Sequence, residues 1–150
     1  MQADAFCSRA IYRDVFFETK HFIAIYNRRP ILPGHTLIVP KRHVTRIVSL
    51  TSDEMLELRD MLRKLLPKLL KTYGADAYNL NTNAGENAGM VINHLHFHLV
   101  PRTANDVFHG KIDLFYRALE DGIAKNSRSV HHEVKRLRKI FRYKPREREE

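Results

Sequence analysis

The stretch "HLHFHLVPR", residues 94–102, places three histidines at every second position and ends in a proline and an arginine. Successive side chains of a β-strand point to opposite faces of the sheet. A strand here therefore puts His94, His96 and His98 on one face. The other face carries Leu95, Phe97 and Leu99. The apolar face can pack on a core, so the histidine face is the one that is left to bind a ligand.

Working outward, four segments are apolar and β-branched enough to predict strands: residues 22–26, 36–39, 77–82 and 91–101. The first two flank a short connection that contains two prolines and a glycine, which is typical of a hairpin.

Residues 51–74 predict an amphipathic helix. Thr51 and Glu54 have the spacing of a capping box, and Gly74 is a typical helix end. Apolar residues recur at helical spacing at Met55, Leu58, Leu62, Leu65 and Leu69. The order strand-strand-helix-strand-strand indicates an α+β fold, an antiparallel sheet with a helix packed on one face.

The composition narrows the class of protein. The 150 residues suffice for one domain with a hydrophobic core. The single cysteine, Cys7, excludes an intramolecular disulfide and predicts a cytoplasmic protein. The first residues lack the basic and apolar regions of a secretory signal, and no apolar run approaches the ~20 residues of a membrane span, so no membrane partner is expected.

The formal net charge of +9 favours anionic partners. The charge is uneven, because residues 125–148 hold ten lysines and arginines against two glutamates. Residues 111–122 and 129–141 predict two helices in this region. We therefore expect a domain of residues 1–104 followed by a basic helical carboxyl-terminal extension of residues 105–150. The extension is either a surface helix or a basic arm that contacts nucleic acid weakly.

Three interpretations of the histidines compete: a solvated polar face, a zinc site and a nucleophile that attacks phosphorus. Three histidines with an open position can form a catalytic zinc site, but no acidic residue of this strand is placed to orient them. A neutral imidazole is a good nucleophile near neutral pH. The upstream loop "NTNAGENAGM", residues 81–90, has glycines whose backbone amides can approach a phosphate closely. This loop favours phosphorus.

Three motifs together carry a family resemblance. "HLHFHLVPR" resembles the alternating histidine signature of the histidine triad (HIT) family of nucleotidyl hydrolases and transferases. "NRRPILPGHTLIVPKRH", residues 27–43, and "NLNTNAGENAG", residues 79–89, resemble the blocks that precede this signature in the family. The resemblance covers about two thirds of the chain and is nearest to the fragile-histidine-triad, or diadenosine polyphosphate hydrolase, branch.

The resemblance implies a reaction. His96 would attack the α-phosphorus of an adenosine-type nucleotide, such as a diadenosine polyphosphate or a nucleoside phosphoramidate, and form a covalent nucleotidyl-histidine that water hydrolyses. His94 and His98 would orient the nucleophile and hydrogen-bond the phosphate, and His35 would complete the cluster. No cofactor is required.

The resemblance also implies a nucleotide site and an assembly. Asn27 would hold the ribose, Asn83 and Gly89 would contact the phosphates or leaving group, and Phe6 and Ile25 would flank the base. Residues 1–104 would form the HIT-like catalytic domain. Its sheet would have five strands, the fifth near "RDVFFE" at residues 13–18, and two chains would form a homodimer with a ten-stranded sheet.

The chain departs from the family pattern at two places. Val91 stands where relatives carry a hydroxyl that bonds a phosphate oxygen, an interaction worth about 1.5–3 kcal/mol. Met90 and Val91 leave open a nucleotide-binding regulatory module with weak catalysis, and the basic extension leaves open a nucleic-acid-associated deadenylating enzyme. Many relatives also carry Cys-x-x-Cys for a structural zinc. Here only Asp4, Cys7, His43 and His94 remain as a weakened ligand set, so we expect no metal.

Overall fold

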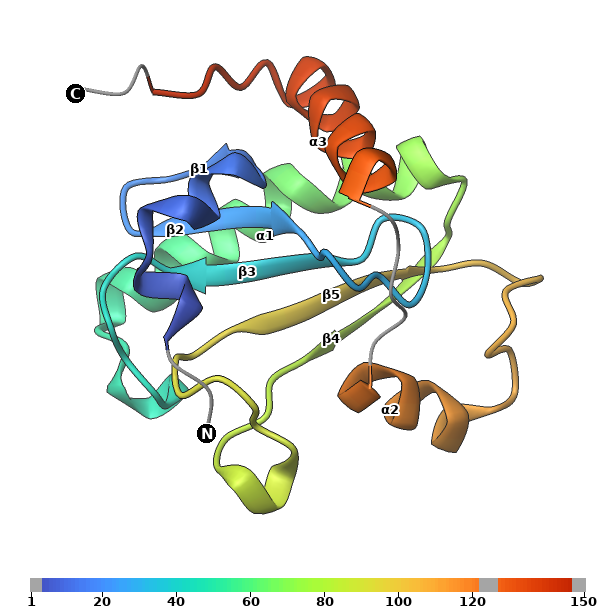
Figure 1. Cartoon of the computed structure of the whole chain (residues 1–150), viewed down its shortest axis with the longest axis horizontal. Helices are drawn as coiled ribbons and strands as arrows, with labels where there is room; N and C mark the ends of the chain where they lie inside the picture. The colour runs from blue at the N-terminus through green and yellow to red at the C-terminus, as the bar shows by residue number, and fades with distance from the viewer. Residues whose placement is uncertain (1–3, 122–126, 147–150) are drawn as a thin grey trace.

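The computed structural model describes residues 4–121 and 127–146. Five antiparallel strands form one sheet in the order β1-β2-β3-β5-β4 (Figure 1). The strands are β1 Val15–Glu18, β2 Phe22–Tyr26, β3 Thr36–Pro40, β4 Ala77–Asn81 and β5 Phe97–Arg102. The predicted α+β class and the fifth strand within residues 13–18 are therefore confirmed.

The prediction of a strand over residues 91–101 is wrong at its start. The strand β5 begins at Phe97, so His98 lies in the sheet while His94 and His96 precede it. The backbone amides ahead of β5 bond outside the ladder: the N–H of His94 donates to the carbonyl of Ile92 (2.8 Å), and that of Leu95 donates to Val44 (2.6 Å). These bonds bend the chain ahead of β5, but the predicted alternation holds, because Leu95, Phe97 and Leu99 all enter the main core while the ring of His96 lies beside that of His98.

The long helix α1, Ser52–Tyr73, begins and ends as predicted. Thr51 forms the capping box with Glu54, and Gly74 ends the helix with a left-handed φ of 62°. The predicted apolar stripe is wrong at Met55, which is 41% exposed, whereas Met61 is buried. No helix within residues 4–121 and 127–146 is long and apolar enough to cross a bilayer.

The two faces of the sheet are covered differently. The helices α1 and α3, Ser127–Phe141, pack on one face around Phe16, Ile38 and Leu99. The short helices η1, Ala5–Cys7, and η2, Arg9–Arg13, lie at the opposite face. That second face carries a smaller apolar cluster consisting of Ile11, Val15, Ile23, Ile25, Leu37 and Val39. Because Leu37 pairs with His98 in the β3–β5 register, His98 also lies on the second face.

The segment after residue 104 contributes both predicted helices, α2, Ile112–Asp121, and α3. Phe115 of α2 is buried against Ile31, Leu32 and Val100. The apolar residues of α3 enter the main core with α1. Gly122 and residues 147–150, which belong to the predicted extension, lie outside the described residues.

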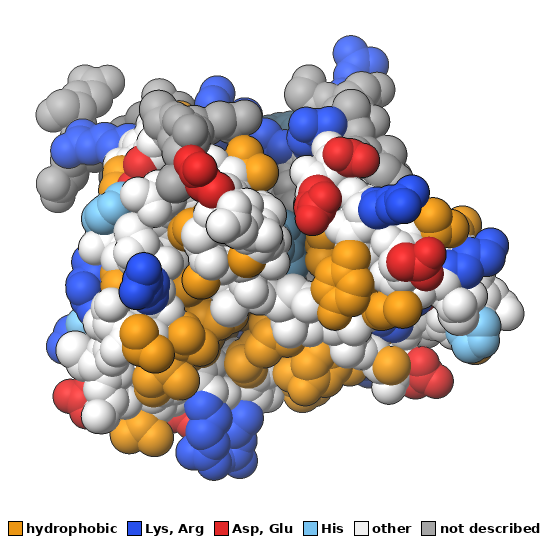
Figure 2. Space-filling view, turned by 90° about the horizontal axis from the view of Figure 1, so that it is seen from below, with side chains coloured by type: hydrophobic (Ala, Val, Ile, Leu, Met, Phe, Trp, Pro, Cys, Tyr) orange, Lys and Arg blue, Asp and Glu red, His pale blue; other side chains and the backbone are white. Residues whose placement is uncertain are grey.

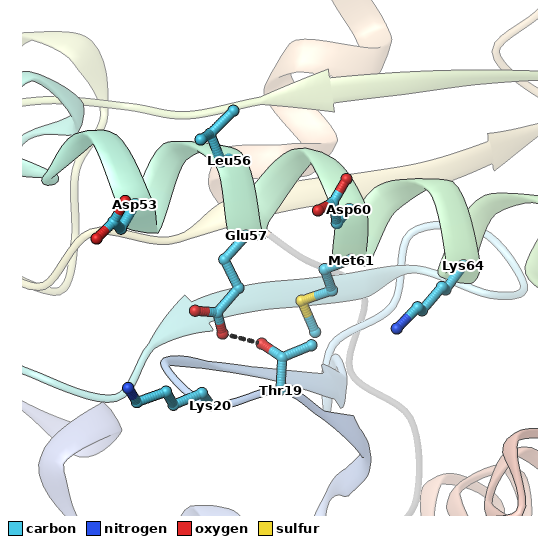
Figure 3. A pocket seen from close by; sticks show the side chains of 8 residues that line it. All are labelled: Thr19, Lys20, Asp53, Leu56, Glu57, Asp60, Met61 and Lys64. Carbon is cyan, nitrogen blue, oxygen red and sulfur yellow. Dashed lines mark hydrogen bonds between the residues drawn. The ribbon is translucent and has the colours of Figure 1, made fainter.

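Glu57 joins α1 to the turn between β1 and β2. Its carboxylate accepts hydrogen bonds from the Thr19 hydroxyl (2.5 Å) and the His21 backbone amide (2.6 Å). Figure 3 shows Glu57 reaching toward Thr19 across a groove along α1. The groove is also lined by Lys20, Asp53, Leu56, Asp60, Met61 and Lys64. None of the predicted site residues lines this groove.

Gly34 offers a test of the packing in the connection that leads to β3. It has a φ of 86°, and a Cβ there would lie 2.6 Å from the Tyr73 ring and 2.9 Å from Pro101. Gly74 has a similar φ of 62° but open space around it. We expect Gly74→Ala to lower the free energy of unfolding by ~1 kcal/mol through backbone strain alone. Gly34→Ala should cost about 2 kcal/mol more, because it adds overpacking.

Urea denaturation of the two variants measures this difference. Equal losses in the two variants would show that Tyr73 and Pro101 give way to the added methyl group.

Candidate active site

His96 is held in one tautomer by a backbone carbonyl. Its Nδ1–H donates to the main-chain oxygen of His94 at 2.8 Å, which leaves a lone pair on Nε2. The main-chain oxygen of His96 accepts a hydrogen bond from the Thr82 hydroxyl at 2.9 Å. Burial lowers the pKa of His96 below 6.5, although the bond to His94 opposes this shift. His96 is therefore neutral at neutral pH, with the lone pair of its ring on Nε2.

His35 and His98 form a relay with defined proton positions. The backbone N–H of Ile31 donates to Nδ1 of His35 at 3.2 Å, so the proton of the neutral His35 ring lies on Nε2. That Nε2–H donates to Nδ1 of His98 at 2.9 Å. Burial lowers the pKa of His35 well below 6.5 and that of His98 to about 3. His98 therefore keeps an Nε2–H, a neutral donor, with its ring centre 5.2 Å from that of His96.

Asn27 lies at the end of β2, beside His35. Its backbone N–H donates to the carbonyl of His35 at 2.9 Å, and its side-chain oxygen accepts from the N–H of Arg29 at 3.0 Å. Its amide nitrogen lies 3.3 Å from Nε2 of His35. Both atoms carry protons in the tautomer above, so this contact is not a hydrogen bond. The amide N–H groups of Asn27 thus remain available to a ligand oxygen.

Phe6 brings the amino-terminal helix η1 against the histidines. Its ring centre lies 5.1 Å from that of His96 and 5.7 Å from that of His94. Phe6 also packs on the apolar cluster that contains Ile25. The structure thus brings the two predicted base-flanking residues to the sheet face that carries His98.

The Asn/Gly-rich loop closes the site from the β4 side. The amide of Asn83 contacts the carbonyl of Gly89 at 3.5 Å. Gly89 has a φ of 82°, and a Cβ there would lie 3.2 Å from the Glu120 carboxylate of α2. The sequence did not predict a role for Thr82, at the start of this loop. Its hydroxyl donates to the carbonyl of His96, and no local pattern around a threonine among asparagines indicates such a long-range hydrogen bond.

The ring of His94 turns to a separate cluster. Its Nε2–H donates to the carbonyl of Pro40 at 2.8 Å. Its Nδ1 faces the carboxylate of Asp4 at 3.0 Å and the sulfur of Cys7 at 3.6 Å. Both ring nitrogens therefore engage protein groups. The main-chain carbonyl of His94, and not its ring, orients the ring of His96.

Asp4, Cys7, His43 and His94 together form a candidate metal-ligand set. Each offers one ligand atom, and these atoms lie within 4.8 Å of one another. With its proton on Nε2, His94 points an Nδ1 lone pair at a carboxylate oxygen, an arrangement that a bound cation would stabilise. One oxygen, one sulfur and two nitrogen donors suit tetrahedral zinc. The residues present therefore fit the metal that the resemblance associates with this place, with Asp4 standing for a cysteine.

Comparison with known proteins gives consistent relatives. The HIT domain family matches residues 8–105. The asymmetrical bis(5'-nucleosyl)-tetraphosphatase of Schizosaccharomyces pombe is 39% identical over 106 residues, which cover 71% of this chain and 57% of that protein. The bis(5'-adenosyl)-triphosphatase of Dictyostelium discoideum is 28% identical over 128 residues, which cover 85% of each. The chain thus spans little more than half the length of the fission-yeast relative.

A solved structure shows the same architecture. A hypothetical histidine triad nucleotide-binding protein from Sulfolobus tokodaii superposes with a TM-score of 0.72 at 25% identity, over 91% of both chains. The family match covers more than half of the chain and includes all the histidines of the cluster. The chain therefore belongs to the HIT domain family.

Proposed function

We propose that this chain is a nucleotidyl hydrolase or transferase that acts on the α-phosphate of adenosine-type nucleotides. Diadenosine polyphosphates and nucleoside phosphoramidates are the proposed substrates. The observation that carries the proposal is the neutral His96, whose Nδ1–H is held by the His94 carbonyl while Nε2 keeps its lone pair. The names of the relatives, a tetraphosphatase and a triphosphatase, support the same class of bond.

The proposed reaction has two displacements. Nε2 of His96 forms a bond to the α-phosphorus, and the bond from phosphorus to the leaving group breaks with its electrons. The Nε2–H of His98 donates to a phosphate oxygen as negative charge develops there. Water then attacks the nucleotidyl-histidine, the phosphorus–nitrogen bond breaks, and the water proton leaves to solvent. The Nδ1–H of His96 stays on the His94 carbonyl throughout, and no cofactor is needed at phosphorus.

The side chain at position 91 affects the rate of the proposed reaction and the choice of substrate. Val91 is 45% exposed and offers no hydroxyl. The neighbouring Met90 is buried, and its sulfur accepts a hydrogen bond from the N–H of Gly85 at 3.3 Å. The loop is thus closed by Met90, and phosphate binding must rely on His98, Asn83 and backbone amides. A lower rate than in relatives with a hydroxyl here is the expected consequence.

We also propose a homodimer that pairs through β4. This strand forms one edge of the sheet, and its backbone can extend the ladder of a second copy. Its outward side chains Tyr78 and Leu80 are exposed. Figure 2 shows hydrophobic side chains gathered on the side of the molecule where β4 lies. Pairing of two β4 edges would produce the expected ten-stranded sheet.

We further propose, in place of the expectation of no metal drawn from the sequence, that Asp4, Cys7, His43 and His94 hold one zinc-class ion. The ion would act structurally, since the ring of His94 lies on the cluster side and His96 needs no metal. It would tie η1 to His94 and to the loop after β3 that carries His43, and so keep Phe6 against His96. A reducing cytoplasm, the proposed location, would keep Cys7 available as a ligand.

Replacement of His96 tests the nucleophile. We expect His96→Asn to lower kcat for diadenosine triphosphate about 10³-fold or more, because no side chain replaces the attacking nitrogen. The matched control is His109→Asn, since His109 is exposed and outside the cluster. Rapid quenching of the wild type followed by mass spectrometry should find the nucleotide mass on His96. Substantial turnover by His96→Asn, or the adduct on another residue, would contradict the assignment.

Light scattering tests the assembly. We expect a solution mass of twice the 17.6 kDa of the chain. Leu80→Lys should give monomers, because it places a charge on the paired edge. Val48→Lys is the control, since Val48 is 83% exposed and lies before α1. A monomeric wild type, or a Leu80→Lys variant that stays dimeric, argues against pairing through β4.

Metal content tests the ligand set. Protein purified without chelator should contain about one zinc per chain by elemental analysis. After replacement with Co²⁺, visible absorption should show tetrahedral bands and a sulfur-to-cobalt band, and Cys7→Ser should lose the latter. His109→Asn should keep both. Absence of stoichiometric metal together with absence of the cobalt bands would rule the site out.

A further inference from the structure

The helix α3 lies outside the residues that define the family. The HIT domain match ends at residue 105, whereas α3 spans Ser127–Phe141. In Figure 1 α3 lies beside β1, at the opposite end of the sheet from β4. Residues 127–146 contain one acidic residue, Glu133. They also contain Arg128 and seven further lysines and arginines. Neither the proposed hydrolysis nor the proposed dimer uses this charge.

Cations on α3 gather on one side of the helix. At about 100° per residue, Arg128, His132, Lys135 and Lys139 project within a narrow sector. Arg142 follows directly after the last turn. These five residues, here named the α3 stripe, are all exposed. From first to last they extend over about 21 Å at 1.5 Å per residue.

The opposite side of α3 is fixed to the body of the protein. Its buried residues belong to the main core: Val130, Val134, Leu137 and Phe141. The guanidinium of Arg138 donates to the carbonyl oxygens of Val15 (2.8 Å), Tyr12 (3.1 Å) and Arg13 (3.0 Å). The α3 stripe is therefore presented on a rigid helix whose apolar face is already occupied.

The charge of the α3 stripe is not compensated. Glu133, the acidic residue of this helix, accepts a hydrogen bond from the Tyr73 hydroxyl (2.6 Å) and pairs with Arg136 (3.5 Å). Within residues 4–121 and 127–146, none of the five stripe residues takes part in an ion pair. A row of exposed like charges destabilises the chain unless an anion binds there.

We propose that the α3 stripe binds the phosphate backbone of nucleic acid. Its length matches about six phosphates of one strand, which are spaced ~3.4 Å along a duplex, and exceeds a single nucleotide. A membrane surface is a poorer fit, since a helix that binds in the interface needs an apolar face for the bilayer, and here that face lies in the core. The contact is to phosphates, so it is independent of sequence.

Fluorescence anisotropy with a labelled 20-nucleotide strand, as DNA and RNA and as the DNA duplex, tests the proposal. The four permanent cations of the stripe predict a slope of log affinity against log salt of about −3.6 for duplex and −2.8 for single strands. Lys135→Ala/Lys139→Ala should lower affinity about 50-fold near 0.1 M salt, because two phosphate contacts are lost. Its slope should become shallower by about 1.8 for duplex.

Arg63→Ala/Lys64→Ala is the matched control, since it removes the same charge from exposed positions of α1. We expect it to bind nearly as the wild type does. The unfolding midpoint and the rate of diadenosine triphosphate hydrolysis should be unchanged in both variants. A failure of nucleic-acid binding can therefore be distinguished from a failure of the proposed hydrolase activity. Equal losses in the two variants, a flat salt dependence, or stripe-dependent binding to anionic vesicles without binding to nucleic acid would overturn the proposal.

Discussion

The site depends on one constraint: the buried imidazoles of His35, His96 and His98 each carry a single proton, and hydrogen bonds that begin at fixed backbone groups decide where it lies. The carbonyl of His94 takes the Nδ1–H of His96, and the amide of Ile31 occupies Nδ1 of His35. The first bond exposes a lone pair for attack. The second keeps the proton of His35 on Nε2, which donates to Nδ1 of His98 and so leaves His98 with an Nε2–H donor. The proposed nucleophile and the proposed phosphate donor thus lie side by side, although both are imidazoles. Burial lowers the pKa of His96 and that of His98, so both rings are neutral and keep these proton positions near neutral pH.

The sheet supports this arrangement because one of its faces carries the main core and the other carries the site. Strand register pairs Leu37 with His98 and Ile38 with Phe97, so alternate residues of β5 serve the site and the core. The core face is closed by α1 and α3, which leaves the site face to η1 and the Asn/Gly-rich loop. Gly34 allows the chain to pass against Tyr73 and Pro101 just before His35. The position of His35 is therefore set by packing on the far side of the sheet as much as by its own bonds.

Local signals were sufficient for much of the fold. The capping box of α1, the hairpin and both carboxyl-terminal helices follow from patterns that operate within a few residues. The failures are long-range in origin. The start of β5 is displaced because Leu95 bonds to Val44, a partner that no periodicity reveals. Met61 replaces Met55 in the core because the sheet, and not the helix, decides which face is covered. Thr82 and the cluster around Asp4 depend on contacts between segments far apart in the chain.

His94 links two parts of the molecule that the histidine signature alone does not separate. Its carbonyl belongs to the catalytic arrangement, while its ring belongs with Asp4, Cys7 and His43. Alternation along a strand would have made all three histidines equivalent helpers around one ligand. In the structure the ring of His94 faces Asp4, Cys7 and His43, while its carbonyl faces His96. The contacts that hold the ring of His94 therefore also hold the peptide group that orients His96. The two nitrogens of the His94 ring face different groups, because Nε2–H donates to the Pro40 carbonyl while Nδ1 faces the Asp4 carboxylate. In the proposed reaction the triplet therefore supplies one nucleophile, one phosphate donor and one structural anchor.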